Sequence, residues 1–187
     1  ARVTGGREEN ARLCEYKFDV IFFTGGKETG RHAAKCAAEN LTPVILELGG
    51  KSPCIVTEDA NLRLAARRIA FGKLLNAGQT CVAPDYLLVH PKVKAPLLLA
   101  LEEEIVKMYG EDPLSREDYP KMIGRRQFDR VLSLIDPEKT VFGGGYDEKT
   151  LKIMPTLLEN VSFDDAAMRE EIFGPVLPVM EAETLDD

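Results

Sequence analysis

The sequence contains few histidines, no closely spaced pair of cysteines and no long apolar run. Its 2 histidines, His32 and His90, lie far apart and no Cys-x-x-Cys accompanies them, so we expect no metal site. The 4 widely spaced cysteines are typical of a reduced compartment rather than of a disulfide framework. Because no run is long enough to span a bilayer and no secretory signal is evident, we expect a cytoplasmic protein.

The chain has no excess of positive charge, and its net charge is −7. Nucleic acid and anionic membrane surfaces both repel negative charge, so we expect neither as the main partner. The 187 residues, 44% of them hydrophobic, suffice for one sizeable core or for one domain with part of another.

Strand-like apolar runs alternate with amphipathic helical stretches along the chain, which predicts an α/β fold with a parallel sheet. The expected strands cover residues 19–23, 43–48, 54–56, 86–89, 153–158 and 176–179. The expected helices cover residues 7–16, 27–40, 59–76, 92–109 and 121–134. No repeat, low-complexity tract or linker interrupts this alternation.

The same pattern makes more specific predictions. The unbroken apolar run 19–23 is typical of a strand buried on both faces of a parallel sheet. Asp59 is expected to cap the helix that follows it, and Lys73 on that helix is expected to be solvated. Gly143-Gly144-Gly145 predicts a hairpin turn rather than a phosphate loop, since no Lys-Ser or Lys-Thr follows it.

Cys81 closes the stretch Asn76-Ala77-Gly78-Gln79-Thr80-Cys81, which lies between an expected helix and an expected strand. Gly78 permits a sharp turn with positive φ, and a cysteine on such a turn can be exposed while the flanking elements hold it in place. Its thiolate could attack an electrophilic carbon. Taken alone, however, a free cysteine is more often a small buried hydrophobic residue.

Glu47 lies among apolar residues just before Gly49-Gly50. A charge so placed is costly unless it is paired or protonated, so Glu47 is either a candidate general base or a side chain that points to solvent at a strand end. The stretch from Thr24 to Gly30 is a glycine-rich turn between a strand and a helix, an arrangement that can bind phosphate. Because the fingerprint G-x-G-x-x-G is absent, spacing alone favours an ordinary turn.

Together these stretches resemble the aldehyde dehydrogenase superfamily over nearly the whole chain. The motifs that carry the resemblance are Phe23-Thr24-Gly25 with Gly30, Leu46-Glu47-Leu48-Gly49-Gly50-Lys51-Ser52-Pro53, Gly78-Gln79-Thr80-Cys81 and Glu170-Glu171-Ile172-Phe173-Gly174-Pro175-Val176. Several long motifs in the same order are far more specific than any short pattern. Residues 41–44 and 81–86 are most similar to the class 3, fatty aldehyde branch.

The resemblance implies an oxidoreductase that converts an aldehyde to a carboxylic acid with NAD or NADP as cofactor. Cys81 would be the nucleophile, whose thiolate adds to the aldehyde to give a thiohemiacetal. Hydride transfer to nicotinamide C4 would then leave a thioester. Glu47 would be the general base that activates the water for hydrolysis of this thioester.

The resemblance also implies the cofactor contacts. Glu171 and Phe173 match residues that hold the nicotinamide ribose and ring. The residues that match the pyrophosphate-side turn are Thr24, Gly25, Gly26 and Gly30, and those that line the nicotinamide end are Leu48 and Gly49. Many relatives have serine at the position of Gly26, so only backbone N–H groups would serve the phosphate there.

By the same likeness, residues 1–46 form the last βα units of a Rossmann-like nucleotide-binding domain, and residues 47–187 form most of the catalytic domain, incomplete at its C-terminus. The chain thus resembles an internal fragment, and the family's oxyanion asparagine would precede residue 1. The full-length protein would be a homodimer. A membrane anchor, where this branch has one, lies in a C-terminal tail beyond residue 187.

Three other functions compete with this one. A cysteine hydrolase or acyltransferase needs a histidine beside the thiol, and only His32 and His90 are available. A non-catalytic domain that keeps the fold would have no chemical need for both Cys81 and Glu47. A CoA-acylating dehydrogenase of the same superfamily is the third alternative, although Glu47 favours hydrolysis because water needs a base more than a thiol does.

Overall fold

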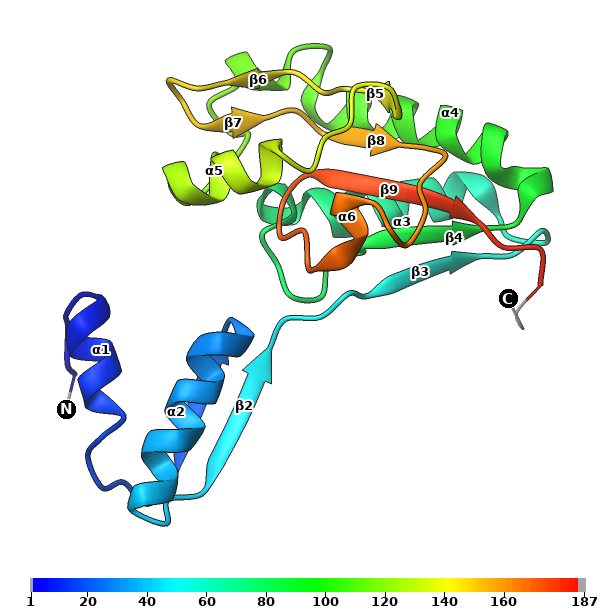
Figure 1. The fold of residues 1–187 in the computed structure, drawn as a ribbon. Helices are drawn as coiled ribbons and strands as arrows, with labels where there is room; N and C mark the ends of the chain where they lie inside the picture. The colour runs from blue at the N-terminus through cyan, green and yellow to red at the C-terminus, as the bar shows by residue number, and fades with distance from the viewer. Residues whose placement is uncertain (1, 185–187) are drawn as a thin grey trace. The chain divides into compact units, whose positions relative to one another are not determined.

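The chain forms two compact units, Ala1–Gly49 and Gly50–Asp187, in the computed structural model, which describes residues 2–184 (Figure 1). Strands alternate with helices in both units, so the expected α/β class is confirmed. The division between the units places Glu47 in the first one. The assignment of residues 1–46 to a nucleotide-binding domain and of residues 47–187 to a catalytic domain stays a prediction.

The first unit is a strand–helix–strand arrangement preceded by a short helix. Its elements are α1 (Arg7–Leu13), β1 (Ile21–Gly25), α2 (Lys27–Glu39) and β2 (Val44–Leu48). β1 and β2 pair in parallel, with Gly25 opposite Leu48 at their carboxyl ends. Gly30 brings α2 close to β2, because a Cβ atom at this position would lie 2.6 Å from Cδ2 of Leu48.

The strand expected at residues 19–23 differs from the observed one in position and burial. β1 begins at Ile21, and its side chains alternate between half-buried and exposed. Phe22 is 65% exposed. Because α2 packs on one face of this two-stranded sheet, the prediction of burial on both faces is wrong for the unit as described.

The second unit is built on a five-stranded sheet in the order β3-β4-β9-β8-β5. Its strands are β3 (Pro53–Val56), β4 (Tyr86–Val89), β5 (Thr140–Phe142), β8 (Thr156–Leu158) and β9 (Val176–Glu181). β3, β4, β9 and β8 are parallel, whereas β5 is antiparallel to β8. The last strand in sequence, β9, thus lies at the centre of the sheet and brings the preceding residues beside the start of β4.

Helices cover both faces of this sheet (Figure 1). They are α3 (Leu62–Leu74), α4 (Pro91–Tyr109), α5 (Arg125–Leu132) and α6 (Ala166–Arg169). One apolar core joins α3 and α4 to the sheet through residues such as Leu97 and Leu177, and a second core contains Phe128 of α5 and Val176. The neighbours Val176 and Leu177 therefore point to opposite faces, as a strand buried on both sides requires. Among the helices of residues 2–184, none combines the length and apolar content needed to cross a bilayer.

The cap expected at Asp59 is wrong. The Asn61 side chain caps α3 by accepting a hydrogen bond from the Leu64 N–H at 3.1 Å. Asp59 instead accepts a bond from the Thr57 hydroxyl at 2.6 Å, within the turn before the helix. The helix therefore begins later than predicted. Asp59 and Asn61 are both good capping residues, and only the geometry of the turn decides which of them caps the helix.

The glycine triplet does not form the expected hairpin. It connects β5 to β6 (Tyr146–Asp147), which pairs instead with β7 (Lys152–Ile153) in a separate two-stranded sheet. Gly143 and Gly144 have φ values of 79° and 81°, a region that glycine adopts without strain. The triplet therefore redirects the chain between two sheets, and the strand expected at residues 153–158 is split into β7 and β8.

Candidate active site

Cys81 follows a tight reversal of the chain at the end of α3. Asn76, Ala77 and Gly78 all have positive φ, at 53°, 51° and 75°. The Asn76 side chain donates a hydrogen bond to the Gln79 carbonyl at 3.2 Å and so closes the turn. The prediction of positive φ at Gly78 is confirmed, but the left-handed Asn76 and Ala77 were not expected.

Gln79 attaches the turn to a distant segment. Its Nε2 donates to the carbonyls of Asn76 and Lys121, both at 3.1 Å, and its Oε1 accepts from the Ile123 N–H at 2.9 Å. These bonds hold residues 121–123 outside any helix, so α5 begins at Arg125 rather than at the predicted Lys121. The turn that precedes Cys81 is thus fixed from both sides.

The thiol turn also packs directly on the backbone of Gly174. A Cβ atom on Gly78 would lie 2.2 Å from the carbonyl oxygen of Gly174. The structure therefore brings Cys81 and the predicted cofactor residues Glu171 and Phe173 into one region of the second unit.

Cys81 is the exposed cysteine of this chain, whereas Cys14, Cys36 and Cys54 are half-buried. Burial raises the pKa of the Cys54 thiol. Burial, and then the neighbouring Cys36 and Glu15, raise the pKa of Cys14. Cys54 and Cys14 are therefore held more firmly in the unreactive thiol form.

The backbone of residues 171–173 is held on two sides. The guanidinium of Arg130 donates to the carbonyl of Glu171 at 3.2 Å and to that of Ile172 at 2.5 Å. The Ile172 N–H donates to Oδ1 of Asp85 at 2.9 Å. Phe173 has φ of 50°, which costs a non-glycine residue about 1–2 kcal/mol and persists only where its surroundings enforce it.

Lys73 is 2% exposed, so the prediction that it is solvated is wrong. It lies one helical turn after Ile69, on the face of α3 that packs on the sheet. Burial lowers the pKa of Lys73 to about 8; Asp85 and Glu171 oppose this shift, and Lys51 adds to it. This buried charge was missed, although the spacing from Ile69 was a signal that could have indicated it.

Glu47, on β2, lies in the first unit on the exposed face of the strand, opposite Thr24 of β1. Within this unit, the exposed position of Glu47 agrees with the alternative that its side chain points to solvent at a strand end. Thr24 and Gly25 end β1, and Gly26 caps α2. Leu48 ends β2 at the same edge of the pair, and Gly49 follows it. Gly30 lies one turn into α2 and is buried against Leu48, so its place in the structure is explained by packing.

The histidines do not support a cysteine hydrolase. His90 follows β4, at the opposite end of that strand from Cys81, and its Nε2 lies 4.0 Å from a carboxylate oxygen of Glu58. His32 lies in the first unit, where a ring nitrogen is 3.6 Å from Sγ of Cys36. Within residues 2–184, no three His, Cys, Asp or Glu side chains are grouped so as to hold a metal ion.

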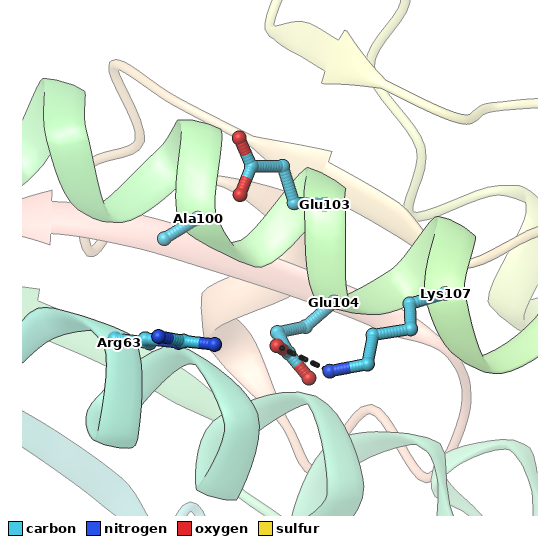
Figure 2. Close-up of a pocket in the computed structure, with 5 residues that line it drawn as sticks. All are labelled: Arg63, Ala100, Glu103, Glu104 and Lys107. Carbon is cyan, nitrogen blue, oxygen red and sulfur yellow. Dashed lines mark hydrogen bonds and ion pairs between the residues drawn. The ribbon is translucent and has the colours of Figure 1, made fainter.

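A surface hollow of about 380 Å³ lies between α3 and α4 (Figure 2). Its lining residues are Arg63, Ala100, Glu103, Glu104 and Lys107. Glu104 and Lys107, one turn apart on α4, form an ion pair on its α4 side, at 3.3 Å. The hollow contains none of the predicted site residues and no cysteine, so it is not a candidate for the chemistry of Cys81.

Comparison with known proteins gives consistent results. The sequence profile of the Aldehyde dehydrogenase family matches residues 2–187. The chain is 46% identical over 185 residues to aldehyde dehydrogenase family 3 member B1 of Bos taurus, and the match covers 99% of this chain and 40% of that protein. It is 45% identical over 185 residues to the dimeric NADP-preferring aldehyde dehydrogenase of Mus musculus, covering 99% of this chain and 41% of the relative.

Among solved structures, the substrate-bound state of Staphylococcus aureus AldH matches with a TM-score of 0.95 and 46% sequence identity. The match covers 98% of this chain and 41% of that one. The chain therefore spans about two fifths of the length of these proteins. The family 3 relative confirms the resemblance to the class 3 branch. Since the family profile matches from residue 2 onward and the relatives agree over nearly the whole chain, this chain belongs to the aldehyde dehydrogenase family.

Proposed function

We propose that the protein containing this chain oxidises an aldehyde to a carboxylic acid with NAD or NADP, through a covalent intermediate on Cys81. The observation that carries the proposal is an exposed thiol that follows a turn packed against the backbone of Gly174. A nucleophile must be accessible and held in a fixed position, and this turn supplies both conditions.

The turn between β1 and α2 suits the pyrophosphate of a dinucleotide. Gly26 caps α2 without any side-chain hydrogen bond to the first-turn N–H groups, which stay available to a phosphate. Thr24 and Gly26 are exposed at this edge. In the proposal, Leu48 and Gly49 line the nicotinamide end, and Glu171 and Phe173 of the second unit hold the nicotinamide ribose and ring.

In the proposed mechanism, the Cys81 thiolate adds to the aldehyde carbon and forms a thiohemiacetal. Bound NAD or NADP supplies the oxidising power by accepting the hydride that this adduct loses. The product on Cys81 is a thioester. Glu47 then accepts a proton from water, whose oxygen attacks the thioester carbon, and the carbon–sulfur bond breaks to release the acid and regenerate the thiolate.

An apolar aldehyde is the substrate class that we favour. Val82, next to the thiol, is 78% exposed, and Ile123, bonded to Gln79 of the same turn, is 82% exposed. Such side chains suit a hydrocarbon tail better than a charged one. The name of the mouse relative, which describes a dimeric and NADP-preferring enzyme, supports a homodimer and a nicotinamide cofactor here.

The test is an assay of the full-length protein with straight-chain aldehydes of increasing length and with each cofactor, following the absorbance of the reduced nicotinamide. We expect reduced cofactor and carboxylic acid to form in equal amounts. Cys81→Ser should abolish this activity, and the matched control Cys36→Ser should retain it. Acyl-CoA in place of acid, when coenzyme A is added, would instead favour the CoA-acylating alternative. No reduction with any aldehyde and either cofactor would overturn the proposal.

A further inference from the structure

Asp85 is a buried carboxylate that connects two segments of the candidate site. It is 4% exposed and lies between Cys81 and the start of β4. Its Oδ1 accepts a hydrogen bond from the Ile172 N–H at 2.9 Å, across 87 positions of sequence, and its Oδ2 pairs with the ammonium of Lys51. A buried charge is costly to retain, so the presence of Asp85 is most simply explained by the two groups that it binds.

We infer that Asp85 is a positioning residue for the nicotinamide half of the cofactor, because it holds the backbone that carries Glu171 and Phe173 in register with the turn that carries Cys81. The inference rests on the proposed function and adds a residue to it. Asp85 would act through the Ile172 N–H, without touching the cofactor.

Asp85 is itself held firmly, as a positioning residue must be. Its own N–H donates to the Ser52 carbonyl at 2.8 Å. The ammonium of Lys51, on its other side, also donates to the Ala167 carbonyl at 2.8 Å. Lys73 lies within electrostatic range, so two buried or half-buried cations lie near this carboxylate.

The segment that Asp85 holds is also supported from other sides. Arg130 binds the carbonyls of Glu171 and Ile172 from the opposite side, and Gly174 packs under Gly78. These contacts are with the backbone, and they leave Phe173 37% exposed. The strained φ of Phe173 needs this support, so loss of the Asp85 bond should let residues 171–173 relax away from the thiol turn.

The pyrophosphate has its proposed contacts elsewhere, at the turn between β1 and α2. Loss of Asp85 should therefore weaken the binding of NADH but not that of ADP, which lacks the nicotinamide ribose and ring. A general loss of structure would weaken both ligands together. The ratio of the two affinities thus separates a positioning role from a merely structural one.

The experiment measures the dissociation constants of NADH and ADP by calorimetry for the full-length protein and for Asp85→Ala. We expect the NADH affinity to fall by about 10- to 100-fold, the range for a lost hydrogen bond to a charged group, while the ADP affinity stays within about 2-fold. Asp85→Asn keeps an acceptor for the Ile172 N–H and should recover most of the NADH affinity. Asp118→Ala, which removes an exposed ion pair with Arg116, is the matched control and should change neither constant.

If Asp85→Ala does not fold, Arg130→Met removes the bonds on the other side of the same segment and should give the same selective loss. An unchanged ratio of NADH to ADP affinity in a folded Asp85→Ala protein, or in Arg130→Met where Asp85→Ala does not fold, would overturn the inference. NADPH replaces NADH in these measurements if the wild-type protein prefers it. A wild-type protein that binds none of NADH, NADPH and ADP would instead overturn the proposed function, and the inference with it.

Discussion

Gly78 and Gly174 are in such close contact that a Cβ atom on Gly78 would lie 2.2 Å from the Gly174 carbonyl oxygen. No side chain fits that gap. The turn that carries Cys81 and the segment that carries Phe173 therefore meet backbone to backbone. Because Gly78 also has φ of 75°, glycine is required there for two independent reasons.

Replacement of Gly78 by alanine should separate these two segments. Gly110→Ala is the matched control, since Gly110 has φ of 74° and open space around it. We expect the control to lose about 1–3 kcal/mol of unfolding free energy from backbone strain alone. Gly78→Ala should lose about 1–3 kcal/mol more from the clash, together with most of the activity. Urea unfolding and turnover of both variants check this; equal losses would show that the close contact does not matter.

Cys81 should react first with iodoacetamide near neutral pH. It is exposed, whereas Cys54 and Cys14 are half-buried and have raised pKa values. Peptide mapping by mass spectrometry over a time course of substoichiometric labelling gives the order of modification. Earlier labelling of Cys36 or Cys54 would count against Cys81 as the nucleophile.

Glu47→Gln in the full-length enzyme should form the acyl-enzyme but hydrolyse it slowly. We expect a burst of reduced cofactor followed by a steady rate about 10²–10⁴-fold below wild type, the usual cost of removing a general base. Glu39→Gln, a change at an exposed position at the end of α2, serves as the control. Rapid-mixing absorbance measurements separate the two phases, and an unchanged steady rate would remove Glu47 from the mechanism.

Lys73 should make stability rise with pH in alkaline solution. Its pKa is about 8 in the folded protein, where burial outweighs the attraction of Asp85 and Glu171 and adds to the repulsion of Lys51. An unfolded lysine titrates near its ordinary pKa of about 10.4, so between these values the unfolded chain binds the extra proton and folding becomes more favourable as pH rises.

Relative to Lys73→Met, the wild-type protein should therefore gain up to about 3 kcal/mol of unfolding free energy between pH 8 and pH 10.5. The difference should be flat below that window, where lysine is charged in both states. Urea unfolding of both proteins across this pH range measures it. If the difference in unfolding free energy between the two proteins stays constant, or falls with pH, the pKa of Lys73 is not lowered by folding.

Local pattern was enough to predict much of this fold. Strands and helices such as β4, α2 and α4 were predicted because their apolar residues recur with the period of a strand or a helix. The predictions at Asp59 and at residues 121–124 were wrong, because competing caps and the long-range bonds of Gln79 decide where those helices begin. The roles of Cys81 and Glu47 came from motif resemblance, and both stay predictions.

The sequence by itself determined the α/β alternation, the family and the glycine-dependent turn before Cys81, since each depends on neighbouring residues or on ordered motifs. Only the tertiary structure decided that Lys73 is buried, that Gly78 lies against Gly174 and that Asp85 binds the Ile172 N–H. Those contacts arise because β9 inserts beside β4 and carries the residues before it to the thiol turn. Strand order is set by packing through space, and no local periodicity encodes which distant backbone a buried carboxylate will meet.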